Sequence, residues 1–380
     1  MTAPLDGLLV LDLAQFLSGP SAALRLGDLG ARVIKVERPV SGDICRTLYL
    51  TDTDLGGDST LFHAINRNKE SLAIDLKDAG DLAALKKLIG RADVLIQNFR
   101  PGVIERLGLG YEDVRAINPR LVYASVSGYG ESGPWVDLPG QDLLAQSLSG
   151  VTWLNGHEGE GPVPLGISIA DMLAGHVLTE GILAALVRRG ITGHGALVQT
   201  SLLEALIDLQ FELLTTHLND GHRLPTRAGF RNANAYLAAP YGIYPTRDGF
   251  LALAMMPLGQ LAARLSLPEL ESYGEGEVFT KRDEIKRLIA SRLAARDTAY
   301  WLEQLRPADI WCAEVLDWPR LLGSRAFGLL DMLQTVERGD GTPVRTTRGP
   351  VRIDGVRASH RRGAPRVGEQ SERIRAEFGL

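Results

Sequence analysis

The chain has little cysteine, and this scarcity excludes two kinds of site. Cys45 and Cys312 are the only cysteines among 380 residues, and neither belongs to a CxxC pair or to a cysteine–histidine spacing. A disulfide framework or a structural zinc site would need more cysteines or such a spacing. We therefore expect a reducing compartment and no bound metal.

A basic excess and a long apolar run are also missing. The chain has 41 lysines and arginines against 46 aspartates and glutamates, whereas nucleic-acid-binding domains carry a basic excess. The N-terminal MTAPLDGLLVLDLAQF lacks the basic region of a secretory leader, and no run of eighteen apolar residues occurs. We expect a cytoplasmic protein that binds neither nucleic acid nor membrane.

The composition that remains is that of a globular protein, and its length predicts two domains or one domain with a large insertion. In the first half, short apolar runs alternate with stretches of helical periodicity. The expected strands cover 7–13, 31–36, 71–75, 92–97 and 121–127, and the expected helices 20–29 and 79–89. This alternation predicts an α/β fold with a mainly parallel sheet, which binds ligands at the carboxyl ends of its strands.

The turn after the first strand lacks the glycine fingerprint of nicotinamide enzymes. A βαβ opening with Glu37 at the end of the second strand is typical of a dinucleotide-binding fold. The turn, however, reads AQFLSGPSAAL, with one glycine followed by proline and no GxGxxG. Nicotinamide binding is therefore disfavoured, and an enzyme of that class without its fingerprint is kept as a minor alternative.

Basic and amide residues recur where the predicted strands end. Arg38 follows the second strand, Asn98 and Arg100 follow the fourth, and Arg106 lies one or two turns further on. The carboxyl ends of parallel strands share one edge of a sheet, and guanidinium groups bind phosphate in a bidentate manner. The pattern predicts an anionic ligand at this edge.

One acidic residue, Asp171, stands between an apolar stretch and a helical pattern in PLGISIADMLAG, residues 164–175. Gly190 is placed to end that helix. Free backbone N–H groups and the macrodipole at the helix start would keep the carboxylate ionised at pH 7. From this stretch alone, an ordinary N-cap and a catalytic carboxylate both remain open.

The pattern changes after residue 205. A basic segment with proline, GHRLPTRAGFRNAN, follows the last helix of the first half, and short strands and amphipathic helices come after it. A strand over 309–315 is expected to be buried. The sequence predicts a large domain of residues 1–205 and 320–380, a linker over 206–228 and a smaller α+β domain over 229–319.

Several longer segments carry a family resemblance. In chain order they are PLDGLLVLDLAQFLSGPSAALRLGDLGARVIKVERPVSGD, NRNKESLAIDLK, NFRPGVIERLGLGYEDV, SGYGESGPW, SIADMLAG, ILAALVRRGITGHGALVQTSLLEA, APYGIYPTRDGFLALA and PRVGEQSERIRAEFGL. Together they resemble the class III CoA transferases, which include formyl-CoA:oxalate and carnitine CoA transferases, with α-methylacyl-CoA racemases as relatives. The match covers nearly the whole chain and does not specify the substrate.

The resemblance implies a large Rossmann-like domain built from both chain ends, an inserted smaller α+β domain, and a homodimer whose chains are interlocked. It implies that Asp171 is the nucleophile, and that the substrates are an acyl-CoA and a small carboxylic acid with no permanently bound cofactor. Backbone N–H groups around Ser18 and near 128–133 are candidate oxyanion donors. The residues matched to coenzyme A contacts are Arg38, Leu72, Ile74, Asn98, Phe99, Arg100 and Arg106.

The implied chemistry suits a carboxylate side chain. Attack on a thioester carbonyl gives a mixed anhydride, and the released thiolate converts this anhydride to an aspartyl-CoA thioester. An acceptor carboxylate then attacks this thioester, and the released thiolate converts the new anhydride to the product acyl-CoA. The expected function is therefore an acyl-CoA:carboxylate CoA-transferase.

Two departures from the family pattern narrow this expectation. Leu17 stands where formyl-CoA transferases have glutamine, and their tetraglycine loop is missing, so we expect an acyl group larger or more apolar than formate. The racemases pair their aspartate with a histidine in a GHD segment, where this chain has Gln141 before Asp142. Glutamine cannot shuttle a proton. A racemase-like enzyme is therefore the alternative, and a CoA-binding protein without turnover a minor one.

Overall fold

The structure is a computed structural model that describes residues 3–380, and the chain divides into two compact units. The first unit contains the chain up to Leu148, Ser168–Leu209 and Leu330–Leu380, and the second contains Ser149–Ile167 and Gln210–Leu329. Residues 149–167, placed in the large domain by the sequence analysis, thus belong to the second unit. We describe each unit by itself.

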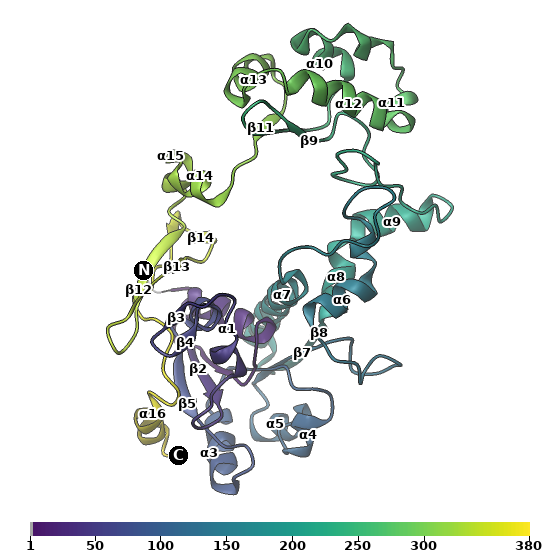
Figure 1. Cartoon of the computed structure of the whole chain (residues 1–380). Helices are drawn as coiled ribbons and strands as arrows, with labels where there is room; N and C mark the ends of the chain where they lie inside the picture. The colour runs from purple at the N-terminus through teal and green to yellow at the C-terminus, as the bar shows by residue number, and fades with distance from the viewer. Residues whose placement is uncertain (1–2) are drawn as a thin grey trace. The chain divides into compact units, whose positions relative to one another are not determined.

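Six parallel strands form the sheet of the first unit, in the order β5–β2–β1–β6–β7–β8. Figure 1 labels β2, β5, β7 and β8 of this sheet. Their bounds are β1 Leu9–Asp12, β2 Arg32–Glu37, β5 Glu70–Ala73, β6 Val94–Gln97, β7 Val122–Ser127 and β8 Ala196–Ser201. The predicted α/β class with a parallel sheet is confirmed. Since β1 pairs with both β2 and β6, the chain switches direction across the sheet at β1 and β6.

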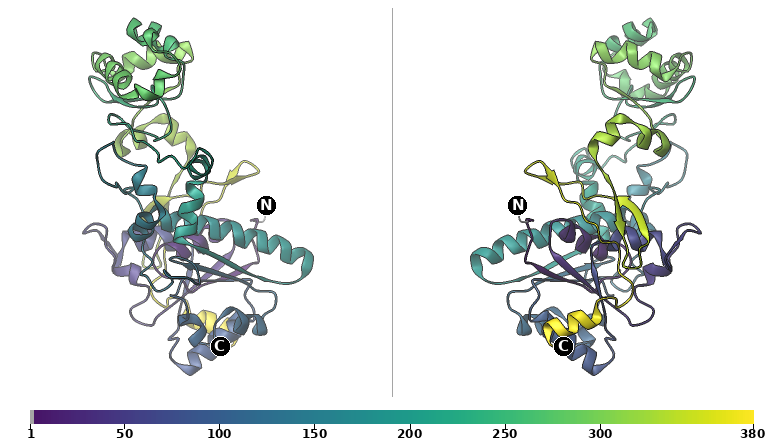
Figure 2. Two further views of the ribbon diagram at one scale, coloured as in Figure 1. Left: turned by 90° about the vertical axis from the view of Figure 1, so that its right-hand side faces the viewer. Right: turned by 90° about the vertical axis from the view of Figure 1, so that its left-hand side faces the viewer.

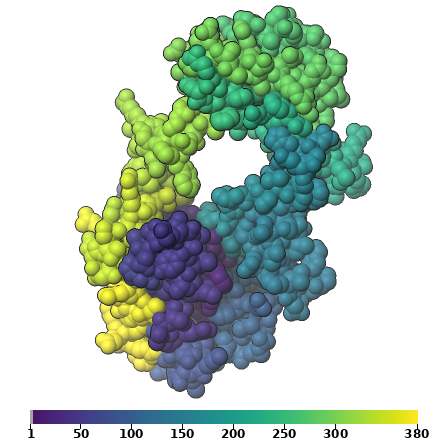
Figure 3. Space-filling view, viewed as in Figure 1, coloured from purple at the N-terminus to yellow at the C-terminus, as the bar shows by residue number. Residues whose placement is uncertain are grey.

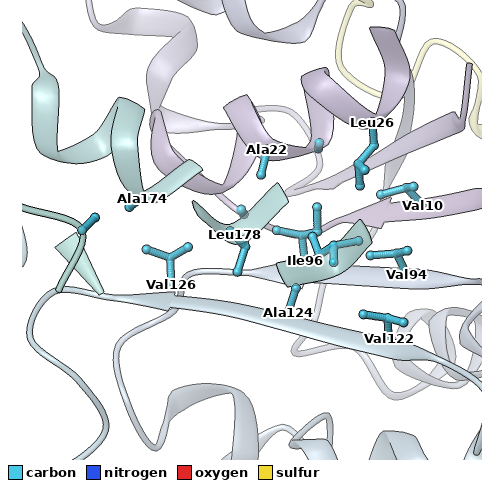
Figure 4. Close-up of a cluster of buried hydrophobic side chains, with 14 of the residues drawn as sticks. Val10, Ala22, Leu26, Val94, Ile96, Val122, Ala124, Val126, Ala174 and Leu178 are labelled. Carbon is cyan, nitrogen blue, oxygen red and sulfur yellow. The ribbon is translucent and has the colours of Figure 1, made fainter. Parts of the chain in front are cut away.

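Helices cover both faces of this sheet, because the strands carry apolar side chains on both faces. Val10, Val94 and Val122 pack against α1 (Ser18–Asp28) and α7 (Ile169–Thr192), as Figure 4 shows. Leu95 and Tyr123, one residue further along their strands, pack on the other face. Figure 2 shows the helices of that face, which are α3 (Ala79–Ile89), α5 (Tyr111–Ile117) and α16 (Ser371–Phe378).

The 24-residue helix α7 is long and apolar enough to cross a membrane, by length and composition alone. Its residues Leu178 and Ile182 are fully buried in the cluster that covers the sheet, which is the packing of a core helix. The helix ends at Gly193 in the left-handed conformation, with φ of +78°. The sequence analysis placed this end at Gly190, which lies inside the helix.

Buried charges join the ends of the strands to the loops that follow them. The Lys69 ammonium is 2.7 Å from the Asp12 carboxylate and donates to the Pro20 carbonyl at 2.8 Å. The Lys35 ammonium is 2.7 Å from Asp43 and donates to the Ala14 carbonyl at 3.0 Å. These contacts hold the loop between β1 and α1 and the first turn of α1.

The C-terminal part of the chain returns to the first unit. Its hairpins β12–β13 and β14–β15 precede α16, and the short β3–β4 hairpin precedes α2. The α-helices and strands of the first unit not yet given are α2 Thr60–Asn66, β3 Asp54–Leu55, β4 Asp58–Ser59, α4 Val103–Arg106, α6 Asp142–Ser149, α8 Leu202–Leu209, β12 Leu333–Glu337, β13 Pro343–Thr347, β14 Arg352–Ile353 and β15 Val356–Arg357. The Gln370 side chain accepts the Ser71 N–H at 2.7 Å, which attaches this segment to β5.

The second unit is an α+β layer with its own core around Tyr244 and Trp301. Its elements are α9 Phe211–Asn219, β9 Gly242–Pro245, β10 Phe250–Leu253, α10 Leu258–Leu265, α11 Glu277–Thr280, α12 Arg282–Leu293, α13 Thr298–Leu305, β11 Cys312–Glu314, α14 Trp318–Gly323 and α15 Arg325–Leu330. The strand expected to be buried over 309–315 is β11, an edge strand whose three residues are partly or fully exposed, so that expectation was wrong.

Replacing Lys69 by methionine should destabilise the fold. The substitution leaves the buried Asp12 carboxylate without its closest cation, since Lys35 lies 4.0 Å away. Removing one partner of a buried ion pair typically lowers the free energy of unfolding by about 3–5 kcal/mol. Denaturant unfolding measures this loss. The matched control is Lys77→Met at an exposed lysine, and an equal loss in both variants would contradict the role of the buried pair.

Candidate active site

Asp171 lies at the start of α7, as the sequence predicted, and is its third residue, but its carboxylate does not cap the helix. The N–H groups of Ala170 and Asp171 donate to Asp142 Oδ2 at 2.7 and 3.3 Å. Asp142, the first residue of α6, therefore satisfies two of the free donors at the start of α7. The expectation that these N–H groups hold the Asp171 carboxylate was wrong, and this leaves that carboxylate available for other contacts.

A close approach of two helices sets the position of Asp171. A Cβ on Gly175 would lie 2.1 Å from Ser21 Oγ and 2.7 Å from the Ser18 carbonyl oxygen, so only glycine allows α7 to pack this tightly on α1. Residues four apart share one face of a helix. Asp171 therefore lies one turn from this contact, beside the first turn of α1, where the Ser18 side chain hydrogen-bonds its carboxylate.

The surroundings of Asp171 raise its pKa to about 6. Burial is the main cause, the negative charge of Asp142 adds to it, and the hydrogen bond from Ser18 opposes both. At pH 7 most molecules still carry the carboxylate, and a carboxylate with a raised pKa is a better nucleophile than an ordinary aspartate. The prediction of an ionised side chain at neutral pH therefore agrees with this pKa.

Asp171 opens onto a cavity of about 520 Å³ in the first unit, which we call the nucleophile cavity. Its polar lining includes Ser18, Asn98, Arg100, Gln141, Asp142 and Asp171, and its apolar lining includes Phe16, Leu48, Phe99, Val136, Leu138 and Leu202. A reacting group can therefore reach the carboxylate. Ser18 and Gly128, two of the places where oxyanion donors were expected, also line this cavity.

A second cavity, of about 430 Å³, lies at the carboxyl ends of β1, β2, β5 and β6, and we call it the strand-end cavity. Arg38, Ile74 and Phe99, three of the residues matched to coenzyme A contacts, line it. Phe99 is a wall of both cavities. Arg100 and Asn98 line only the nucleophile cavity, and two predicted contacts line neither: Leu72 is fully buried between sheet and helices, and Arg106 ends α4.

The loop after β1 separates the two cavities and is held in an unusual conformation. The Asn98 side chain accepts the Gln15 N–H at 2.8 Å and donates to the Gln15 carbonyl at 2.7 Å. Phe16, which follows, has a φ of +62°, a left-handed conformation that is costly for a bulky residue. Asn98 thus positions a strained loop at the point where the strand order reverses, and ligands bind there in open α/β sheets.

Sequence reasoning missed the role of Asp142. Its contact with the start of α7 joins residues 28 positions apart, and no local pattern shows such a contact. The available signal was the acid Asp142 in the segment Gly140–Asp142. The comparison of this segment with the racemase GHD segment used only the residue before the acid, Gln141. Among residues 3–380, no group of three or more histidine, cysteine, aspartate or glutamate side chains is arranged to hold a metal ion.

Comparison with known proteins assigns these features to a family. The model of CoA-transferase family III matches residues 5–371. The chain belongs to this family. The CoA-transferase is 34% identical to the acetyl-CoA:oxalate CoA-transferase of Acetobacter aceti, over 99% of this chain and 96% of that one. It is 35% identical to the succinyl-CoA:glutarate CoA-transferase of Mus musculus, over 79% of this chain and 69% of the relative.

Solved structures agree with this assignment. A CAIB/BAIF family protein from Brucella suis matches the CoA-transferase with a TM-score of 0.86 and 29% identity, and the match covers 100% of both chains. Rv3272 from Mycobacterium tuberculosis matches with a TM-score of 0.82 and 29% identity, over 98% of this chain and 99% of that one. The resemblance that the sequence motifs carried is confirmed.

Replacing Asp142 by asparagine should shift the pH dependence of the enzyme. Asparagine keeps an oxygen that accepts the N–H groups of α7 but removes the charge that helps to raise the pKa of Asp171. The loss of activity on acidification, expected near pH 6, should then move to lower pH. The pH profile of turnover measures this shift. The control Asp137→Asn alters an exposed acid of the preceding loop, and an unmoved profile in Asp142→Asn would contradict the coupling.

Proposed function

We propose that this family III CoA-transferase moves coenzyme A between an acyl-CoA and a small carboxylic acid, with Asp171 as the nucleophile. The observation that carries the proposal is the placement of Asp171, a carboxylate with a raised pKa, in a cavity that shares the Phe99 wall with the strand-end cavity. The nucleotide end of coenzyme A would occupy the strand-end cavity, and its thioester would reach Asp171.

The first half of the proposed reaction transfers coenzyme A to the enzyme. An Asp171 oxygen attacks the thioester carbonyl, the carbon–sulfur bond breaks, and the thiolate leaves with the bonding electrons. The product is a mixed anhydride between Asp171 and the donor acid. The thiolate then attacks the Asp171 carbonyl of this anhydride, releasing the donor acid as a carboxylate and leaving an aspartyl-CoA thioester.

The second half repeats these steps in the opposite order. The acceptor carboxylate attacks the aspartyl-CoA carbonyl and releases the thiolate, which gives an anhydride between Asp171 and the acceptor. The thiolate attacks the acceptor side of this anhydride, forms the new acyl-CoA and restores the Asp171 carboxylate. Each bond formed matches one broken, and no redox step occurs.

The side chains around Asp171 suit these intermediates. Donors in the first turn of α1, at Ser18, lie beside the carboxylate and can stabilise the oxyanion that forms at each attack. Apolar residues such as Phe16 and Leu202 line the same cavity and help to exclude water, which would hydrolyse an anhydride. Gln141 also lines it, where a racemase would need a proton-shuttling group.

Replacing Asp171 should abolish transfer and spare binding. Neither Asp171→Ala nor Asp171→Asn can form the anhydride, whereas the strand-end cavity is unchanged in both. We expect transfer from a panel of acyl-CoA donors to mono- and dicarboxylic acids to fall by at least about 10³-fold, with an unchanged dissociation constant for coenzyme A. Mass spectrometry of the acyl-CoA products and calorimetric titration make these measurements.

The control for this experiment is Asp137→Ala, an exposed acid in the loop between β7 and α6 that does not line the nucleophile cavity. It should transfer at the rate of the unaltered enzyme. Normal turnover in Asp171→Ala would contradict the proposed nucleophile.

We also propose that the enzyme is a homodimer with interlocked chains, as the family resemblance implies. The support is α9 of the second unit, where no residue is buried and Phe211, Leu214 and Leu218 are exposed at helical spacing. A second copy of the chain would cover this apolar stripe. Light scattering of the unaltered enzyme should give twice the mass of one chain. The double variant Phe211→Asp, Leu218→Asp should give a lower mass. A mass of one chain for the unaltered enzyme would contradict the dimer.

A further inference from the structure

A third cavity of the first unit, of about 640 Å³, lies next to the strand-end cavity and is rich in arginine. We call it the arginine cavity. It shares Gln15, Arg38 and Gly42 with the strand-end cavity, so Arg38 stands between the two. The charged residues of its lining are Arg38, Arg46, Asp58, Arg338 and Arg366.

Two of these four arginines are neutralised by buried acids. Arg46 lies 2.9 Å from the Asp58 carboxylate and 2.6 Å from that of Glu37, and Arg338 also pairs with Asp58. Both guanidinium groups are buried and committed to these contacts.

The other two, Arg38 and Arg366, are exposed, and within the described part of the chain their guanidinium groups have no carboxylate within ion-pair distance. Arg366 acts on Asp340 only through its charge at longer range. The arginine cavity therefore presents two guanidinium groups that are not engaged in ion pairs, and such groups can bind a phosphate dianion in a bidentate manner.

Arg366 belongs to a segment that is firmly attached to the first unit. The Gly363 N–H donates to the Glu337 carbonyl at 2.7 Å, Arg46 donates to the Pro365 carbonyl at 3.0 Å, and the Gly368 N–H donates to Ser71 Oγ at 2.8 Å. Figure 3 shows the C-terminal part of the chain, in yellow, against the N-terminal part, in purple. The backbone around Arg366 is thus placed before any ligand binds, which reduces the entropic cost of binding.

The three cavities adjoin one another in the same order as the groups along a coenzyme A molecule. The nucleophile cavity meets the strand-end cavity at Phe99, and the strand-end cavity meets the arginine cavity at Arg38. Coenzyme A carries its thioester at one end and a ribose 3′-phosphate beside the adenine at the other. With the thioester at Asp171 and the adenine among the apolar side chains of the strand-end cavity, the 3′-phosphate falls beyond it.

We infer that Arg366, together with Arg38, binds the 3′-phosphate of coenzyme A in the arginine cavity. The inference rests on the proposed function, because it needs the thioester at Asp171. It assigns to the C-terminal segment a part in recognising the substrate, in addition to its hydrogen bonds with the rest of the first unit. Arg366 distinguishes coenzyme A from 3′-dephospho-coenzyme A, which has the same thiol, pantetheine, pyrophosphate and adenine.

The test compares the dissociation constants of coenzyme A and 3′-dephospho-coenzyme A by calorimetric titration of the full-length enzyme. Arg366→Ala should weaken binding of coenzyme A by about tenfold, the usual loss for one charge-assisted contact, and should leave binding of the dephospho form unchanged. Arg366→Lys should recover part of the loss, and Arg366→Glu should enlarge it. Circular dichroism melting of each variant confirms that the fold is kept.

The matched control is Arg361→Ala, an exposed arginine of the same segment that does not line the arginine cavity, and it should bind both ligands as the unaltered enzyme does. Equal weakening of both ligands by Arg366→Ala, or no weakening of either, would overturn the assignment of Arg366 while leaving the proposed function intact. Failure of the unaltered enzyme to bind coenzyme A would overturn both.

Discussion

The contact between α1 and α7 at Gly175 is the constraint on which the candidate site depends. Any side chain at this position would meet Ser21 and the Ser18 carbonyl, so the two helices pack this closely only because the residue is glycine. Asp171, one turn earlier on the same face, is thereby held against the first turn of α1. Its burial there, beside Asp142, gives the carboxylate its raised pKa and still leaves it open to a cavity.

The sheet supplies the second requirement, a crevice for a long ligand. The strand order reverses at β1 and β6, and the loops after these two strands diverge there. Asn98 holds the first loop at Gln15, and the buried lysines hold the same loop and the start of α1. The cavities on either side of this loop are therefore preformed, which favours the binding of an extended molecule such as coenzyme A.

Much of the first unit could be predicted from sequence because its signals are local. The helix 79–89 and the strands after it have clear periodicity, and the acid at the start of α7 stands alone among apolar neighbours. Features set by distant contacts could not be predicted. The Asp142 cap joins two helices, the return of the C-terminal chain places Arg366 and Arg38 in the lining of one cavity, and β11 is an edge strand of its sheet. The helix extends beyond Gly190 to Gly193 because an interior glycine is tolerated when the packing of the other residues continues.

The account depends most directly on a covalent bond between Asp171 and the transferred group. Incubating the enzyme with an acyl-CoA donor and hydroxylamine, followed by proteolysis and mass spectrometry, tests for that bond, because hydroxylamine converts an activated aspartyl group to a hydroxamate. The account predicts a hydroxamate on the peptide that contains Asp171, formed only when the donor is present. Modification of a different acid, or of none while transfer proceeds, would contradict it.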